Sequence, residues 1–128
     1  MRIHHLAIGV KDLEESVQFY QQCFGFKEQE RFTKEGWDGK VVILRLGEVN
    51  LELFHFNEQI ESKDNHNQFN VIGLKHIAFL VDSVDETYSR LKKLNVDIDK
   101  PQLGTTCAKF CFLRDPNGVV IELYERRK

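Results

Sequence analysis

The chain has little cysteine, little net charge and no long apolar run, and each shortage argues against a class of protein. Its three cysteines are odd in number and form no Cys-x-x-Cys pair, so a disulfide framework is not expected. The formal net charge is −2 with lysine and arginine scattered, which argues against nucleic acid as the main partner. No apolar run approaches the length needed to cross a bilayer, so no membrane partner is expected.

What remains is the composition of an ordinary soluble globular protein, with 41% hydrophobic and 30% charged residues among 128. Residues 1–5 lead directly into a strand-like pattern without an apolar signal core, and the cysteine pattern fits a reducing compartment. The expected location is therefore the cytoplasm. The cysteines are expected to be small buried side chains, and a reactive thiol at Cys107 or Cys111 is the alternative.

The chain repeats itself once. Residues 5–10 (HLAIGV) recur as 76–81 (HIAFLV), and residues 49–54 (VNLELF) recur as 119–124 (VVIELY). The members of the two pairs lie 71 and 70 residues apart, and such a fixed period indicates a duplicated structural unit. The polar stretch at 57–70 is the natural linker between the halves.

Each half begins with an alternating β-type segment that leads into a helix. Asp12 with Glu15, and Ser83 with Glu86, have the spacing of a capping box, which gives partners to unpaired backbone N–H groups at a helix start. Apolar residues at helical spacing and a residue suited to the helix end follow each box. They are Leu13, Val17, Tyr20, Phe24 and Gly25 in the first half, and Val84, Tyr88, Leu91, Leu94 and Asn95 in the second.

Short strands follow each helix. They are predicted at 41–46 and 49–56 in the first half, and at 109–113 and 119–124 around the turn at 115–118 (DPNG) in the second. The sequence thus predicts an α+β fold of two paired βαβββ modules that form one curved mixed sheet with the helices outside. We expect a single domain over 1–128, with module one at about 1–56, a linker at about 57–70 and module two at about 71–128.

A histidine occupies the matching position on the first strand of both halves. Because side chains alternate across a strand, His5 shares its face with Ala7 and Gly9, and His76 shares its face with Ala78. These small neighbours leave room for an occupant beside each imidazole.

Glu52 and Glu122 each stand between two apolar residues of a strand. A carboxylate in that position either points to bulk water or needs compensation, because burying an unpaired charge is costly. Since both halves pair it with a histidine, one shared ion is the simpler account, with His5, Glu52, His76 and Glu122 as its ligands. Such mixed donors suit a single divalent Zn, Ni, Co or Mn ion, and the lack of cysteine among them favours a catalytic site with open water positions.

The other three histidines are weaker candidates. His4 lies on the strand face opposite to His5 and is expected to pack or to meet solvent. His55 follows Glu52 by three residues and is expected to face the other way, and His66 lies in the linker.

Together these motifs resemble the vicinal oxygen chelate superfamily, which includes glyoxalase I, fosfomycin-resistance thiol transferases, bleomycin-binding proteins, methylmalonyl-CoA epimerases and extradiol dioxygenases. The resemblance covers essentially the whole chain and implies a concave metal site. It rests on residues 5–12 (HLAIGVKD), 19–20 (FY), 24–26 (FGF), 51–53 (LEL), 76–79 (HIAF) and 115–123 (DPNGVVIEL).

Within this superfamily the four ligands help to choose a member. Small bacterial glyoxalase I carries the same residue types at the positions of His5, Glu52, His76 and Glu122, whereas epimerases often have Gln in place of Glu52. Fosfomycin transferases usually use only His5, His76 and Glu122, and bleomycin-binding members generally lack the set. The resemblance therefore implies isomerase or lyase chemistry on a small-molecule substrate. Because members often pair, we also expect a homodimer, with the site inside one chain or shared between two.

Two departures concern the thiol of the substrate. Bacterial glyoxalase I usually has Arg at the position of Gly9 and Asn at that of Phe56, and both contribute to holding glutathione. Another thiol adduct, or a different hydroxy-carbonyl substrate, fits this chain as well.

The predicted reaction is proton transfer next to a metal-chelated carbonyl, with Glu52 or Glu122 as the catalytic base and the histidines as ligands only. A second reading is a non-enzymatic drug or metabolite binder, whose pocket would use aromatic side chains that otherwise belong to the core: Trp37, Phe54, Phe56 and Phe110. A third reading is thiol transfer to an antibiotic, which could dispense with Glu52.

Overall fold

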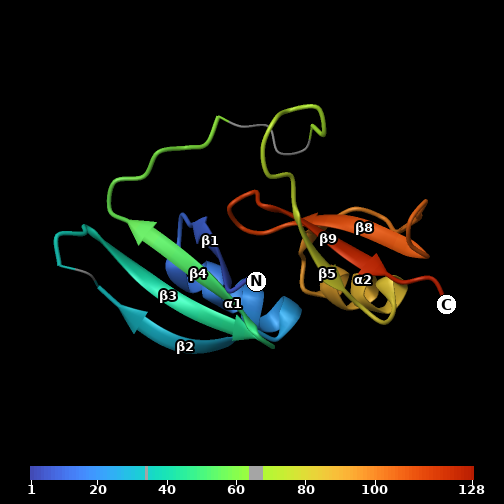
Figure 1. Cartoon of the computed structure of the whole chain (residues 1–128), viewed down its shortest axis with the longest axis horizontal. Coiled ribbons are helices and arrows are strands. Elements are labelled where there is room, and N and C mark those ends of the chain that lie inside the picture. The colour runs from blue at the N-terminus through green and yellow to red at the C-terminus, as the bar shows by residue number, and fades with distance from the viewer. Residues whose placement is uncertain (34, 64–67) are drawn as a thin grey trace. The chain divides into compact units, whose positions relative to one another are not determined.

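A computed structural model describes residues 1–33, 35–63 and 68–128 of the chain. These residues contain two helices and nine strands in two mixed sheets, which confirms the α+β class (Figure 1). The chain divides into two compact units, Met1–Ser62 and Lys63–Lys128. His66 and the middle of the predicted linker lie outside the described residues.

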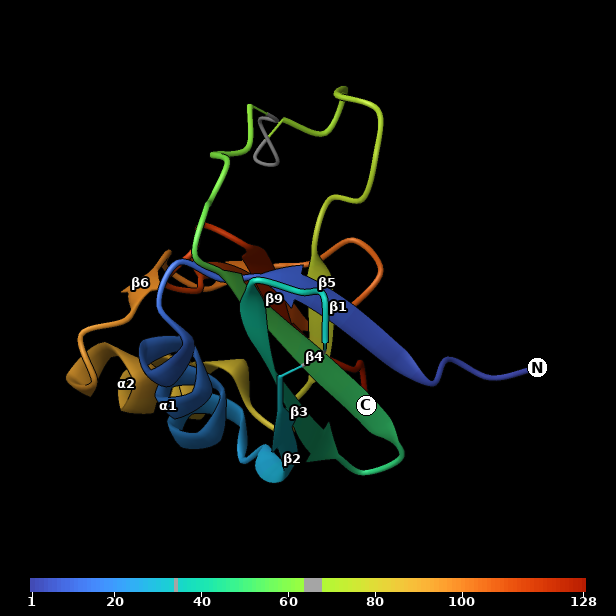
Figure 2. The ribbon, with the colours of Figure 1, turned by 90° about the vertical axis from the view of Figure 1, so that its left-hand side faces the viewer.

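The first unit is a βαβββ module with a four-stranded sheet. Strand β1 runs parallel to β4, and the β4–β3 and β3–β2 pairs are antiparallel, in the order β1-β4-β3-β2. Helix α1 lies against one face of this sheet (Figure 2). The bounds are β1 His5–Gly9, α1 Leu13–Phe24, β2 Lys27–Phe32, β3 Gly39–Leu46 and β4 Val49–Phe56.

The second unit repeats this plan with shorter strands. Strand β5 runs parallel to β9, and β9–β8 and β8–β6 are antiparallel, with β7 also paired to β8. Helix α2 contacts β6, β8 and β9. The bounds are β5 Ile77–Leu80, α2 Val84–Lys93, β6 Asp97–Ile98, β7 Gln102–Leu103, β8 Lys109–Arg114 and β9 Val120–Glu125.

Both helices begin and end where the sequence predicts. Asp12 Oδ1 accepts a hydrogen bond of 3.0 Å from the backbone N–H three residues on, and Ser83 Oγ accepts the equivalent bond at 3.2 Å. Gly25 follows α1 at φ 78° and Asn95 follows α2 at φ 59°, in the left-handed region that ends a helix. None of the helices in the described ranges is long and apolar enough to span a membrane.

The core of each unit lies between its helix and the leucine-rich face of its sheet. Leu51 and Leu53 of β4 are 3% and 0% exposed, and Ile121 and Leu123 of β9 are both fully buried. Because side chains alternate along a strand, the glutamate between each of these pairs points to the sheet face that carries no helix. This alternation positions the candidate site.

Candidate functional site

In the first unit, neighbouring parallel strands bring His5 and Glu52 together. Ala7 of β1 lies opposite Glu52 of β4, so His5, two residues earlier, is on the same face of the sheet. His5 Nε2 lies 3.2 Å from Glu52 Oε2. The two side chains are 46% and 21% exposed, so this pair is open to solvent.

The second unit forms the same pair in the same register. Ala78 of β5 lies opposite Glu122 of β9, and His76 stands two residues before Ala78. His76 Nε2 lies 2.9 Å from Glu122 Oε2. Here the side chains are only 25% and 15% exposed, which makes this the less solvated of the two pairs.

Both separations fit two donors that bind side by side to one metal ion. A nitrogen and an oxygen each about 2.1 Å from an ion, and about 90–109° apart around it, are roughly 3.0–3.4 Å from each other. Within either unit taken by itself, the described residues bring together no group of three or more His, Cys, Asp or Glu side chains suited to a metal ion. Each unit therefore offers two donors, one imidazole and one carboxylate.

His4 contacts Nδ1 of His5, the ring nitrogen of His5 that is not directed at Glu52. The two Nδ1 atoms are 3.0 Å apart, and the rings meet edge to face with centroids 5.2 Å apart. In such a contact one nitrogen donates and the other accepts. When His5 Nδ1 carries the proton and donates it to His4, the Nε2 lone pair is left for a metal.

Strand alternation alone did not predict this contact. It predicts that His4 packs or meets solvent, and the side chain is indeed exposed, but its ring turns back onto its neighbour. The available signal was the His4–His5 dipeptide itself.

Aromatic rings surround the imidazole of the second pair. The Phe112 ring centroid is 5.4 Å from that of His76 at an interplanar angle of 66°, and Phe69 lies 6.2 Å from both. Phe112 is also the β8 residue opposite Glu122, so it flanks both members of the pair. We refer to Phe69 and Phe112 as the His76 aromatic cluster; the sequence analysis did not identify either residue.

A different aromatic cluster lies beyond Glu52 on β4. The Trp37 ring is 5.8 Å from Phe54 and 5.5 Å from Phe56, tilted by 40° and 37°. Trp37 is 40% exposed and Phe56 is 38% exposed, so these two rings are not core residues. Phe54 and Phe56 lie two and four residues after Glu52 on the strand, so their side chains share its face. We call these three residues the Trp37 cluster.

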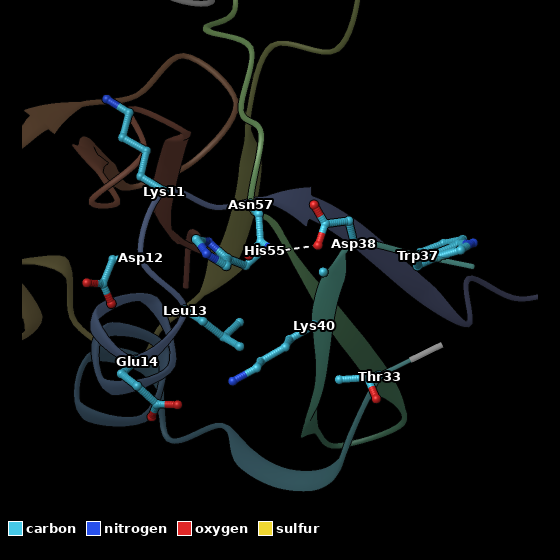
Figure 3. Close-up of a pocket in the computed structure, with 11 residues that line it drawn as sticks. Lys11, Asp12, Leu13, Glu14, Thr33, Trp37, Asp38, Lys40, His55 and Asn57 are labelled. Carbon is cyan, nitrogen blue, oxygen red and sulfur yellow. Dashed lines mark hydrogen bonds between the residues drawn. The ribbon is translucent and has the colours of Figure 1, made fainter. Parts of the chain in front are cut away.

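A separate hollow of about 490 Å³ lies around the start of α1 (Figure 3). His55 lines it, with Nδ1 3.3 Å from the carbonyl oxygen of Val10 and 3.0 Å from Gln59 Nε2. His55 thus faces away from Glu52, as predicted. The other residues around the hollow are Lys11, Asp12, Leu13, Glu14, Thr33, Trp37, Asp38, Gly39, Lys40 and Asn57.

The acidic groups at this hollow are engaged in holding the fold. Asp12 caps α1, and Asp38 accepts a hydrogen bond from Asn57. Glu14 is bonded to Arg31, which lowers the pKa of that carboxyl below its usual range. Neither His5 nor Glu52 lines the hollow, so it is distinct from the candidate site.

All three cysteines are buried, as the sequence predicts. Burial raises the pKa of the Cys111 thiol to about 11, with a further contribution from nearby carboxylates that include Asp99. A thiol with that pKa is protonated at neutral pH and is a poor nucleophile. The alternative of a reactive thiol at Cys111 therefore finds no support.

Comparisons with known proteins show what the whole chain is similar to. A sequence profile of the Glyoxalase/Bleomycin resistance protein/Dioxygenase superfamily matches residues 2–123. The YaeR protein of Escherichia coli is 32% identical, over 98% of this chain and 96% of that protein. Human mitochondrial methylmalonyl-CoA epimerase is 29% identical, over 95% of this chain and 72% of that protein. The solved structure of the trypanothione-dependent glyoxalase I of Leishmania major has a TM-score of 0.78 at 28% identity, over 98% of this chain and 86% of that one.

Proposed function

Because the chain belongs to the Glyoxalase/Bleomycin resistance protein/Dioxygenase superfamily, we propose that it is a metal-dependent, glyoxalase I-like lyase or isomerase. The reaction is proton transfer next to a carbonyl of a small molecule. One observation carries the proposal: both modules form the same histidine–glutamate pair in the same strand register, with donor atoms 3.2 and 2.9 Å apart.

The residues proposed to hold the ion are His5, Glu52, His76 and Glu122. Two imidazoles and two carboxylates suit Zn, Ni, Co or Mn, and four protein donors leave coordination positions for substrate oxygens on an ion that takes five or six ligands. The two pairs are contributed by one chain or by two copies of the chain in a homodimer.

When bound, the ion supplies Lewis-acid polarisation of two neighbouring substrate oxygens. Glu52 or Glu122 takes the proton from the carbon next to the carbonyl and returns it to the adjacent carbon. Each carboxylate is partly shielded from water, with the side chains of Glu52 and Glu122 21% and 15% exposed. His5 and His76 act only as ligands.

Metal analysis of the purified protein tests the proposal. We expect about one Zn, Ni, Co or Mn per His5–Glu52–His76–Glu122 set, measured by elemental analysis of protein prepared without chelators. His5→Ala and Glu122→Ala should lose the ion. His55→Ala, which alters a histidine on the other side of the same sheet, is the matched control and should keep it.

Turnover is then assayed on α-hydroxy-carbonyl compounds and on thiol adducts of α-oxo-aldehydes. Protein that binds no metal, and takes none up on reconstitution, contradicts the proposal.

The exposed rings of the Trp37 cluster favour one alternative, a non-enzymatic binder of drugs or metabolites. That alternative predicts ligand binding without metal and without turnover. Thiol transfer to an antibiotic is a further alternative, and it predicts that Glu52→Gln remains active.

A further inference from the structure

The Glu52 face of the first sheet has an aromatic end. Phe54 and Phe56 follow Glu52 on the same face of β4, and Trp37 packs against both rings. Phe56 lies so close over Gly39 that a Cβ there would be 2.9 Å from its ring, so Gly39 permits this ring position. Partly exposed rings fixed in this way next to a candidate site indicate a surface for a ligand.

Open space adjoins this aromatic end. Gly9 of β1 lies directly opposite Phe54, and a Cβ built on Gly9 meets no atom within 4 Å. Gly9 is two residues beyond Ala7, the residue opposite Glu52, which places the space about 7 Å from the level of that carboxylate. In the second module the corresponding residue is Leu80, so the space is specific to the first.

The lysine and arginine side chains that the strands place on this face stand at its other end. Arg45 lies opposite Asn50, and Lys27 lies opposite Arg45. Four residues of strand separate Asn50 from Phe54, a distance of about 13 Å. On that face an anionic group placed against Phe54 would lose hydration without a strand lysine or arginine beside it, whereas a planar uncharged group would gain apolar and ring contacts.

From these observations, and resting on the proposed function, we propose that the substrate carries an uncharged planar group, such as an aromatic ring, next to its chelating oxygens. That group occupies the space beside Gly9 and packs on Phe54 and the exposed rings of Trp37 and Phe56. The group attached next to the chelating oxygens of the substrate is therefore apolar, unlike the anionic group that a charged thiol would contribute.

Two probes that share their oxygens and differ in the attached group test this inference. They are 2-hydroxyacetophenone, which carries a phenyl ring, and hydroxyacetone, which carries a methyl group. Trp37 is the only tryptophan of the chain, so its fluorescence reports a ligand that reaches this ring, at the aromatic end or in the hollow that it also lines. Affinities are measured by calorimetry on the metal-loaded protein.

We expect 2-hydroxyacetophenone to bind at least about tenfold more tightly than hydroxyacetone and to change the Trp37 emission. Gly9→Leu introduces the residue found at the matching position of module two and should weaken binding of 2-hydroxyacetophenone enough to remove most of that preference. Gly9→Ser, which fills little of the space, is the matched control and should retain the preference. Circular dichroism establishes that each variant is folded.

Equal affinities for the two probes, or a phenyl preference that survives Gly9→Leu, would overturn the inference. Failure of the proposed function shows differently, as absence of bound metal and of turnover on any hydroxy-carbonyl compound. The two failures are thus read from separate measurements.

Discussion

The His5–Glu52 pair and the His76–Glu122 pair share a strand register and differ in their surroundings. The first is open to solvent, and its histidine contacts His4. The second is about half as exposed at the histidine, and Phe69 and Phe112 surround its imidazole. The two modules therefore share the histidine–glutamate pair and differ in what orients the histidine: a ring-nitrogen contact with His4 in one module, and aromatic packing in the other.

This difference has a consequence for metal binding. A donor pair that is already held in place loses less conformational freedom when an ion binds than a mobile pair does. We therefore infer that the second pair is the better organised half of the centre. Substitutions in and around each pair test that ranking.

Replacing the carboxylates should have the largest effect. Glu122→Gln and Glu52→Gln each remove a metal-binding charge, and loss of the one that acts as base should lower kcat by about 10²–10⁴-fold. Metal affinity should fall more for Glu122→Gln, because its pair is less exposed and better held. Glu48→Gln, an exposed glutamate at the turn before β4, should leave both quantities unchanged.

Elemental analysis and steady-state kinetics measure the two effects separately. A fully active Glu122→Gln protein would contradict the role assigned to this residue. A larger loss of metal in Glu52→Gln would reverse the ranking of the two pairs.

Removing the hydrogen-bond partner of His5 should have an intermediate effect. His4→Phe keeps a ring beside His5 but cannot accept a proton from its Nδ1, so metal affinity should fall about tenfold. The control is Lys75→Phe, at the residue that precedes His76. The Lys75 ammonium donates to the carbonyl oxygen of Gln68, and its loss should leave metal affinity unchanged. Competition with a chromophoric chelator measures both, and equal losses in the two variants would show that His4 has no specific role.

Removing the ring beside His76 should have a smaller effect. Phe112→Leu replaces an edge-to-face contact worth about 0.5–1.5 kcal/mol, so metal affinity should fall about two- to tenfold. Trp37→Leu changes a ring of the other module that packs against Phe54 and Phe56, and metal affinity should be unaffected. If Trp37→Leu weakens metal binding as much as Phe112→Leu, the two aromatic clusters do not have the separate roles inferred here.

Much of the fold could be predicted because the two halves of the sequence carry the same motifs at the same spacing. The repeated motifs located β1, β4, β5 and β9 to within a few residues, and the capping residues located both helices. Strand β2 could not be located, because its residues (KEQERF) are all exposed and carry no apolar alternation; it is a strand because β3 pairs with it. Strands β6 and β7 are two residues each and are too short to leave a pattern.

The sequence predicted which two side chains meet in each module, and the metal site that would join both pairs stays a prediction. Alternation gives the face of a side chain, and that sufficed to bring His5 to Glu52 and His76 to Glu122 within each module. The contact of His4 with His5 depends on side-chain rotamers, which alternation does not describe. The rings around His76 come from separate segments of the chain, whose pairing only the fold reveals.

The smallest effect is expected at Cys111, which occupies the β8 position matching Val42 of β3, each opposite a buried leucine. Cys111→Val should cost less than about 1.5 kcal/mol of stability, because both side chains are small and apolar and module one already accepts valine there. The pKa of about 11 keeps the thiol protonated below that pH, so iodoacetamide should label it in unfolded protein and not in folded protein at pH 7. Mass spectrometry after alkylation measures the labelling, and thermal unfolding measures the stability. Rapid labelling of the folded protein would show that Cys111 is not the inert counterpart of Val42 and that the modules differ in their cores as well as around their donor pairs.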